Sequence, residues 1–135
     1  MYLLDTGVLS QTAKAQPDER VMAWWAACRD SDLALSAVSI HELRYGIELL
    51  PTGARRLQLE SWFSKVLDRF RGRILAVEEE VASLSGAMLA ETKIAGHTAE
   101  VSDVLIAATV RVHGLKLATL NRKHFEGFGV ELVEF

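Results

Sequence analysis

The stretch Tyr2-Leu3-Leu4-Asp5-Thr6 opens the chain and predicts the element around which the rest is organised. Its apolar residues have no polar face, which is typical of a strand buried on both sides in a parallel sheet. A carboxylate inside such a strand has a large desolvation cost, so we expect Asp5 at the strand's carboxyl end. Ligands bind at that edge of open α/β sheets, and the stretch therefore predicts a functional site beside Asp5.

The composition limits the class of protein. The chain has 135 residues, 50% of them hydrophobic and only two of them proline, so we expect one globular domain over residues 1–135. Cys28 is the only cysteine, which excludes an internal disulfide and a cysteine zinc site and suits a reducing cytoplasm. The N-terminal apolar run is too short for a signal peptide, and no stretch approaches the length of a membrane span.

The net charge of −3 argues against a passive nucleic-acid-binding module, because such modules usually carry a basic balance. The charge remains compatible with an enzyme that clusters acids and holds nucleic acid through local basic residues. Two basic runs, Arg55-Arg56 and Arg122-Lys123-His124, are usual for solvated faces. They become candidate phosphate contacts only if they flank the site.

Hydrophobic periodicity and turn residues predict strands and helices that alternate along the chain. Strands are expected at residues 2–4, 33–35, 74–77, 115–119 and 130–133. Helices are expected at residues 7–15, 19–28, 39–50, 55–70, 78–95 and 101–113, with a polar turn at 121–125. This order favours parallel crossovers and predicts an α/β fold, a three-layer α/β/α sandwich around a mostly parallel sheet.

Three acidic residues occupy positions that are unusual for a carboxylate. Asp5 ends the first strand, Glu42 is expected in the first turn of the helix after the second strand, and Asp103 in the first turn of an almost wholly apolar helix. Strand ends and helix starts share one edge of a parallel sheet, so we expect the three carboxylates to converge. Converging carboxylates repel unless a cation neutralises them, and ligand sets of oxygen alone favour Mg²⁺ or Mn²⁺.

Each acid also has a purely structural interpretation. Ser39 and Glu42 match an S-x-x-E capping box, Asp5 could cap the following helix, and Asp103 could interact favourably with a helix dipole. The shared edge makes the three structural interpretations together less convincing than each is alone. The histidines show no metal-ligand spacing and are expected at the surface or in the core; they are His41, His97, His113 and His124.

Four stretches, spread over the chain in order, carry a further pattern. They are YLLDT at 2–6, SIHELRYG at 39–46, SDVLIAAT at 102–109 and HGLKLATLN at 113–121, the last leading to His124-Phe125. Together they resemble the PIN-domain ribonucleases, in particular the VapC- and FitB-like toxins of VapBC-type toxin–antitoxin pairs. The resemblance implies a PIN-like fold and a metal-dependent endoribonuclease that cuts single-stranded regions of structured RNA. It also implies inhibition by a small VapB-like antitoxin and a homodimer.

The resemblance also implies site residues. The acidic metal-binding positions of the family fall on Asp5, Glu42 and Asp103, and the supporting polar positions on Thr6, Thr119 and Asn121. The sequence departs from the family at Gly7, where Asn is usual. It departs again in the turn after the fourth strand, where the family often has a fourth acid and this chain offers Asn121 or His124.

The expected reaction is hydrolysis of a phosphodiester bond by water activated by Mg²⁺ or Mn²⁺. Asp5 and Asp103 are expected to hold the metal, with Glu42 as a further ligand or as the group that orients the water. Two other interpretations stay open. One is a PIN-like scaffold that binds without cutting. The other is a phosphohydrolase or receiver of similar architecture, which is disfavoured because no second Asp stands two residues after Asp5.

Overall fold

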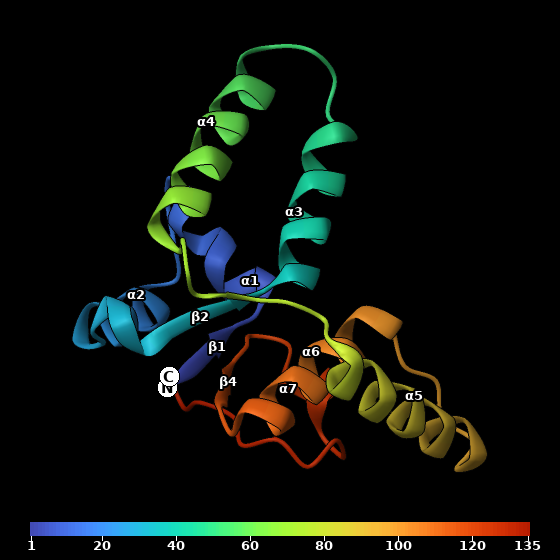
Figure 1. Ribbon diagram of the computed structural model, residues 1–135. Coiled ribbons are helices and arrows are strands. Elements are labelled where there is room, and N and C mark those ends of the chain that lie inside the picture. The colour runs from blue at the N-terminus through green and yellow to red at the C-terminus, as the bar shows by residue number, and fades with distance from the viewer.

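The computed structural model describes residues 1–135, and four parallel strands form its sheet in the order β3-β2-β1-β4 (Figure 1). The strands are β1 (Tyr2–Leu4), β2 (Leu33–Ser36), β3 (Ile74–Leu75) and β4 (Lys116–Ala118). Leu3 of β1 pairs with Ala34 of β2 on one side and with Leu117 of β4 on the other. Parallel neighbours require crossover connections, as the alternation of strands and helices predicted.

Helices cover both faces of this sheet. They are α1 (Thr6–Leu9), α2 (Glu19–Ala27), α3 (Ala37–Glu48), α4 (Ala54–Arg69), α5 (Glu79–Ile94), α6 (Val101–His113) and α7 (Arg122–Phe125), with 3₁₀ turns η1 (Ser10–Ala13) and η2 (Asp30–Asp32). Helices α1 to α4 pack mainly on one face, and α5 to α7 on the other. The predicted α/β/α architecture with a parallel sheet is therefore confirmed. None of the helices has the length and apolar character that crossing a bilayer requires.

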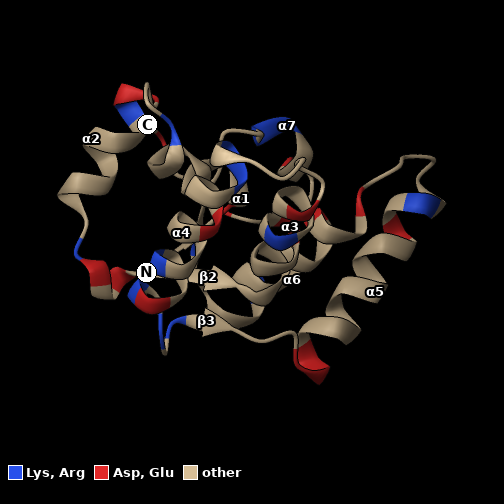
Figure 2. Ribbon diagram, turned by 90° about the horizontal axis from the view of Figure 1, so that it is seen from above, with Lys and Arg blue, Asp and Glu red and all other residues tan.

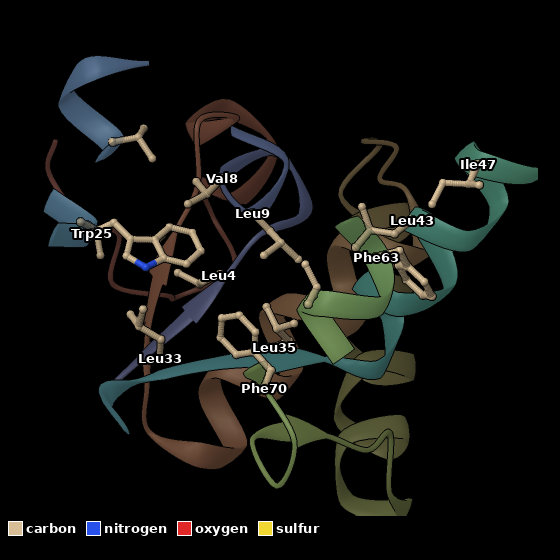
Figure 3. Close-up of a cluster of buried hydrophobic side chains, with 14 residues drawn as sticks. Leu4, Val8, Leu9, Trp25, Leu33, Leu35, Leu43, Ile47, Phe63 and Phe70 are labelled. Atoms are coloured by element: carbon tan, nitrogen blue, oxygen red, sulfur yellow. The ribbon is translucent and has the colours of Figure 1, made fainter. Parts of the chain in front are cut away.

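The face covered by α1 to α4 is packed with large side chains (Figure 3). Leu4, Leu33 and Leu35 of the strands lie against Trp25 and Phe70. The two aromatic rings meet edge to face, with centroids 6.4 Å apart, an arrangement that rings prefer. This packing fixes the central strands, and with them the residues at their carboxyl ends.

The opposite face receives the alternate strand residues, Leu3 and Ala34, because successive side chains of a strand point to opposite sides. Helix α6 lies on this face with small residues, Ala107 and Ala108, fully buried. Small side chains let the helix approach the sheet closely. The first turn of α6 is thereby brought to the carboxyl edge of the strands.

The predicted helix at 39–50 begins earlier than its sequence indicated. Ser36 is its N-cap, and the Ser36 hydroxyl accepts a hydrogen bond from the Val38 backbone N at 3.0 Å. Ser39 therefore lies inside α3, and the capping box with Glu42 is wrong. Glu42 falls in the second turn of the helix, so its side chain is not required for capping.

The C-terminal part of the chain differs most from the prediction. Residues 130–133 do not form a strand, and only Leu132 bridges to Leu117 of β4. Gly127 and Gly129 both have left-handed φ angles, 89° and 68°, which turn the chain sharply just before this segment. The expected turn at 121–125 contains the short helix α7. The expected strand 74–77 ends at Leu75, and Val77 is exposed.

Candidate active site

Asp5 leaves β1 at the carboxyl edge of the sheet, where the sequence predicted it, and is only 5% exposed. Its Oδ1 accepts a hydrogen bond from the Thr6 backbone N at 2.9 Å and so caps α1. Its Oδ2 accepts a hydrogen bond from Thr119 Oγ1 at 2.7 Å. Asp5 therefore caps α1 and also lies at the candidate site. Each of its carboxylate oxygens accepts one hydrogen bond, which fixes the side chain.

Glu42 reaches the same edge from α3. The Thr6 hydroxyl donates to Glu42 Oε1 at 2.8 Å. The same Thr6 Oγ1 atom lies 3.1 Å from Ser39 Oγ. Ser39 is fully buried, so this contact forms inside the junction of α1 and α3. Thr6 thus links the capped start of α1 to Glu42 and lies at the candidate site; its supporting role stays a prediction.

Asp103 enters from the first turn of α6 and meets His124 of α7. The Nδ1 atom of His124 lies 3.1 Å from Asp103 Oδ2. The Asp103 side chain is 17% exposed and the His124 ring is 57% exposed. The expectation that the histidines are surface or core residues is therefore incomplete, since His124 is at the site. Spacing could not reveal this contact; the only signal was the position of His124 in the family pattern.

The turn between β4 and α7 contributes mainly through its backbone. Asn121 N donates to Thr119 Oγ1 at 3.0 Å, while the exposed Asn121 side chain makes no capping hydrogen bond. The basic run at 122–124 flanks the candidate site through His124, whereas Arg56 and Arg122 are engaged elsewhere. Arg56 pairs with acids of α3 and α4, and Arg122 pairs with Glu134.

Burial raises the pKa of Asp5, Glu42 and Asp103. For Glu42 and Asp103, the negative charge of neighbouring carboxylates raises the pKa further. The charges of Asp5 and Asp103 raise the pKa of Glu42 further, and the charge of Asp5 raises the pKa of Asp103. For Asp5, burial outweighs the hydrogen bonds from Thr119 and Thr6, which lower its pKa. No Lys or Arg forms an ion pair with any of the three; His124 is the basic residue in contact with Asp103, and the nearby charge of His41 lowers the pKa of Glu42. Viewed from above, acidic residues lie at the centre of the molecule between α1, α3 and α7 (Figure 2).

The donor set suits a hard divalent cation, because it consists of carboxylate and hydroxyl oxygens. The side chains do not, however, form a closed group of three His, Cys, Asp or Glu ligands. Mg²⁺ is usually held by only one or two carboxylates, with waters and substrate phosphates as the other ligands. The residues present therefore fit Mg²⁺ or Mn²⁺ as a site that substrate completes.

A groove of about 760 Å³ opens beside Asp103 and His124, between the end of α5, the start of α6 and α7. Its lining includes the acids Glu91, Glu100 and Glu126 and the bases Arg111 and Lys123. Because acids and bases are mixed, the groove lacks the positive potential with which proteins hold a phosphate backbone.

The family model of the PIN domain matches residues 2–129, and the chain belongs to this family. The family that the sequence resembled is thus confirmed.

Named relatives match over nearly the whole chain. The VapC ribonuclease Y4jK of Sinorhizobium fredii is 34% identical over 98% of this chain and 96% of the relative. The toxin FitB of Neisseria gonorrhoeae is 38% identical over 93% of this chain and 91% of the relative. The crystal structure of FitAcB from Neisseria gonorrhoeae superposes with a TM-score of 0.90 at 36% identity, covering 99% of this chain and 97% of that one. Other solved chains with this fold belong to toxin–antitoxin complexes.

Proposed function

We propose that this protein is a metal-dependent endoribonuclease that acts as the toxin of a toxin–antitoxin pair. One observation carries the proposal: Asp5, Glu42 and Asp103 come from three distant parts of the chain to one edge of the sheet, without a Lys or Arg to neutralise them. Similarity to ribonucleases and toxins over the full length supports the same reaction.

The chain's own residues would divide the work. Asp5 and Asp103 would hold Mg²⁺ or Mn²⁺, which when bound lowers the pKa of water and offsets charge on the scissile phosphate. Thr119 and Thr6 fix the carboxylates of Asp5 and Glu42 in place. His124 orients Asp103 through its Nδ1 contact. Hydrolysis would then leave a 5′-phosphate and a 3′-hydroxyl on single-stranded RNA.

The partners follow from the same site. An unneutralised acidic cluster is a suitable place for an Arg or Lys of a small VapB-like antitoxin, which would compete with the metal. The solved relatives that belong to toxin–antitoxin complexes support this partner. A toxin that cuts cellular RNA would act in the cytoplasm, and the family resemblance supports a homodimer.

Glu42→Gln tests the nuclease with a matched control on the same helix. The purified protein is incubated with structured RNA in Mg²⁺, in Mn²⁺ and in chelator, and the product ends are identified. We expect metal-dependent cleavage that Glu42→Gln abolishes and Glu48→Gln retains, since Glu48 pairs with Arg44 and Arg56 on the outer surface. A wild type without cleavage in either metal would favour the binding scaffold.

Expression in a bacterial host tests the toxin role separately. We expect the wild type to arrest growth, Glu42→Gln to be harmless, and co-expression of a small protein encoded beside it to restore growth. Unimpaired growth with a protein that cleaves RNA in vitro would leave the nuclease intact and remove the toxin role.

A further inference from the structure

Two aromatic rings lie exposed on the outer face of α3, next to the candidate site. His41 and Tyr45 are one helical turn apart, and their ring planes are parallel to within 5°, with centroids 6.5 Å apart. Tyr45 is 62% exposed and belongs to neither hydrophobic core cluster. A ring at this exposure contributes little to the fold through burial and is free to contact a ligand.

The rings are placed by the helix that carries Glu42. His41 directly precedes Glu42, and Tyr45 follows it by three residues, so the Tyr45 and Glu42 Cβ atoms are about 5–6 Å apart on the helix surface. Leu43 and Ile47 anchor the other side of α3 in the core. The aromatic face is therefore held rigidly at the margin of the site.

The shape of this face does not suit a docked helix or a second protomer. Leu49 continues the line of His41 and Tyr45, but the line is one residue wide, because the Arg44–Glu48 ion pair runs beside it. A docked helix needs apolar anchors at three- and four-residue spacings together. Here the positions three and seven residues after His41 are Arg44 and Glu48, which are charged.

A nucleobase matches the face better than a protein does. Proteins recognise single-stranded RNA by stacking splayed bases on Tyr, His, Phe or Trp rings. Stacking accepts every base, because each has a π face, and contributes to affinity more than to sequence choice. The mixed charge of the groove beyond Asp103 gives a strand no comparable attraction on that side.

We propose that His41 and Tyr45 form a stacking surface for one base of single-stranded RNA, in a nucleotide next to the scissile phosphate. This assignment rests on the proposed nuclease function and adds to it a means of selecting unpaired RNA. A base inside a duplex has both faces covered by its neighbours and cannot lie on the two rings. The surface thereby favours loops and single strands over helices.

Binding of a fluorescently labelled, unstructured single-stranded RNA oligonucleotide in chelator tests the proposal without cleavage. We expect Tyr45→Ala to weaken binding about 5- to 150-fold, the range measured for the loss of one base–aromatic stack. Tyr45→Phe, which keeps the ring, should restore most of the affinity. Leu57→Ala is the matched control, because Leu57 is 66% exposed on α4, outside the aromatic face. In cleavage assays the loss should fall on KM and leave kcat nearly intact.

Other results would overturn the stacking surface. Wild-type affinity in Tyr45→Ala would remove it. A change of oligomeric state in Tyr45→Ala on size-exclusion chromatography, with RNA binding unchanged, would identify the face as a protein interface. Cleavage by the wild type together with either result would leave the nuclease proposal standing, whereas a wild type that binds the oligonucleotide through Tyr45 and never cuts would refute the nuclease alone.

Discussion

The acidic residues at the two ends of the sheet have pKa values shifted in opposite directions. At the carboxyl edge, Asp5, Glu42 and Asp103 have no Lys or Arg partner, and burial raises their pKa values. At the amino end of β2, Asp30 accepts two hydrogen bonds from Arg69, at 3.0 and 2.6 Å, which lower its pKa. The same residue type is destabilised in its charged form at one end and stabilised at the other.

Arg73 extends the contrast at the amino end. Its guanidinium donates to the backbone oxygens of Asp30, Leu33 and Arg69, at 2.6 Å for the last two. It also lies over the Phe70 ring, 4.8 Å from the centroid. At this end arginines of the chain itself neutralise the Asp30 carboxylate, whereas at the carboxyl edge no Lys or Arg pairs with the three acids. The difference separates an acid that stabilises the fold, Asp30, from the three acids of the candidate site.

The largest expected effect is that Asp103→Asn and Asp30→Asn differ in opposite directions in cleavage activity and in melting temperature. Asp103→Asn should lower cleavage by more than about 100-fold, beyond the usual effect of losing an outer partner of a metal ligand. Its melting temperature without metal should not fall, because a charge that is unfavourable in the fold is removed. Asp30→Asn should keep full cleavage and melt lower. Thermal unfolding and a cleavage assay on the same samples check both; equal activities would break the contrast.

The second largest effect should be the gain in stability on metal binding, which should differ between the two variants. Mg²⁺ or Mn²⁺ at 100 times its dissociation constant should stabilise the wild type by about 2.7 kcal/mol, since the ion binds the folded state only. Asp30→Asn should show the same gain, and Asp103→Asn a much smaller one. Melting curves over a metal titration measure this. Identical gains in both variants would place the cation away from the carboxyl edge.

Arg73→Met should destabilise the fold by about 1–3 kcal/mol, because it leaves backbone oxygens at the start of β2 without their donor. Met keeps an apolar stem but removes the guanidinium, so the loss includes the contact with the Phe70 ring and the ion pair with Asp30 as well as the hydrogen bonds. Denaturant unfolding measures the loss, and cleavage at low temperature should be unchanged. A midpoint equal to that of the wild type would mean that water replaces Arg73 at no cost.

The smallest expected effect is on the pH dependence of stability. Asp30 has a lowered pKa in the fold, so its contribution is present above its unfolded pKa of about 3.9 and is lost as the pH falls through the lower, folded value. The stability difference between wild type and Asp30→Asn should therefore shrink on acidification. The pKa of Asp103 is raised in the fold, so its charged form destabilises the protein at neutral pH. The stability gain of Asp103→Asn over the wild type should therefore also shrink on acidification, as the wild-type carboxylate takes up a proton. Unfolding curves across acidic pH test both directions.

Local pattern was sufficient to predict the four strands of the sheet and the acids at its carboxyl edge. The strand at 2–4 is apolar on both faces, and a carboxylate at its end can only sit where the strand stops. The placement of Asp103 followed in the same way from an apolar helix with one acid in its first turn. Both placements follow from the cost of burying a carboxylate among apolar residues, and the apolar neighbours can be read from the sequence.

Features that depend on distant partners could not be predicted in this way. Ser36 and Ser39 are both competent caps, and only the packing of β2 selects Ser36. The contact of His124 with Asp103 spans 21 positions and depends on where α7 settles. The strand expected at 130–133 had the right residues but follows two left-handed glycines, which leave it a single bridge.

The hydrogen bond from Thr119 to Asp5 joins positions 114 apart in the chain. β1 is a central strand, and its neighbour β4 is the last strand to be synthesised. Synthesis proceeds from the N-terminus, so a nascent chain carries Asp5 long before the strand that fixes it exists. The Asp5 carboxylate therefore lacks one of its two hydrogen-bond partners until residue 119 has been made, and the site of the proposed nuclease cannot be complete before then.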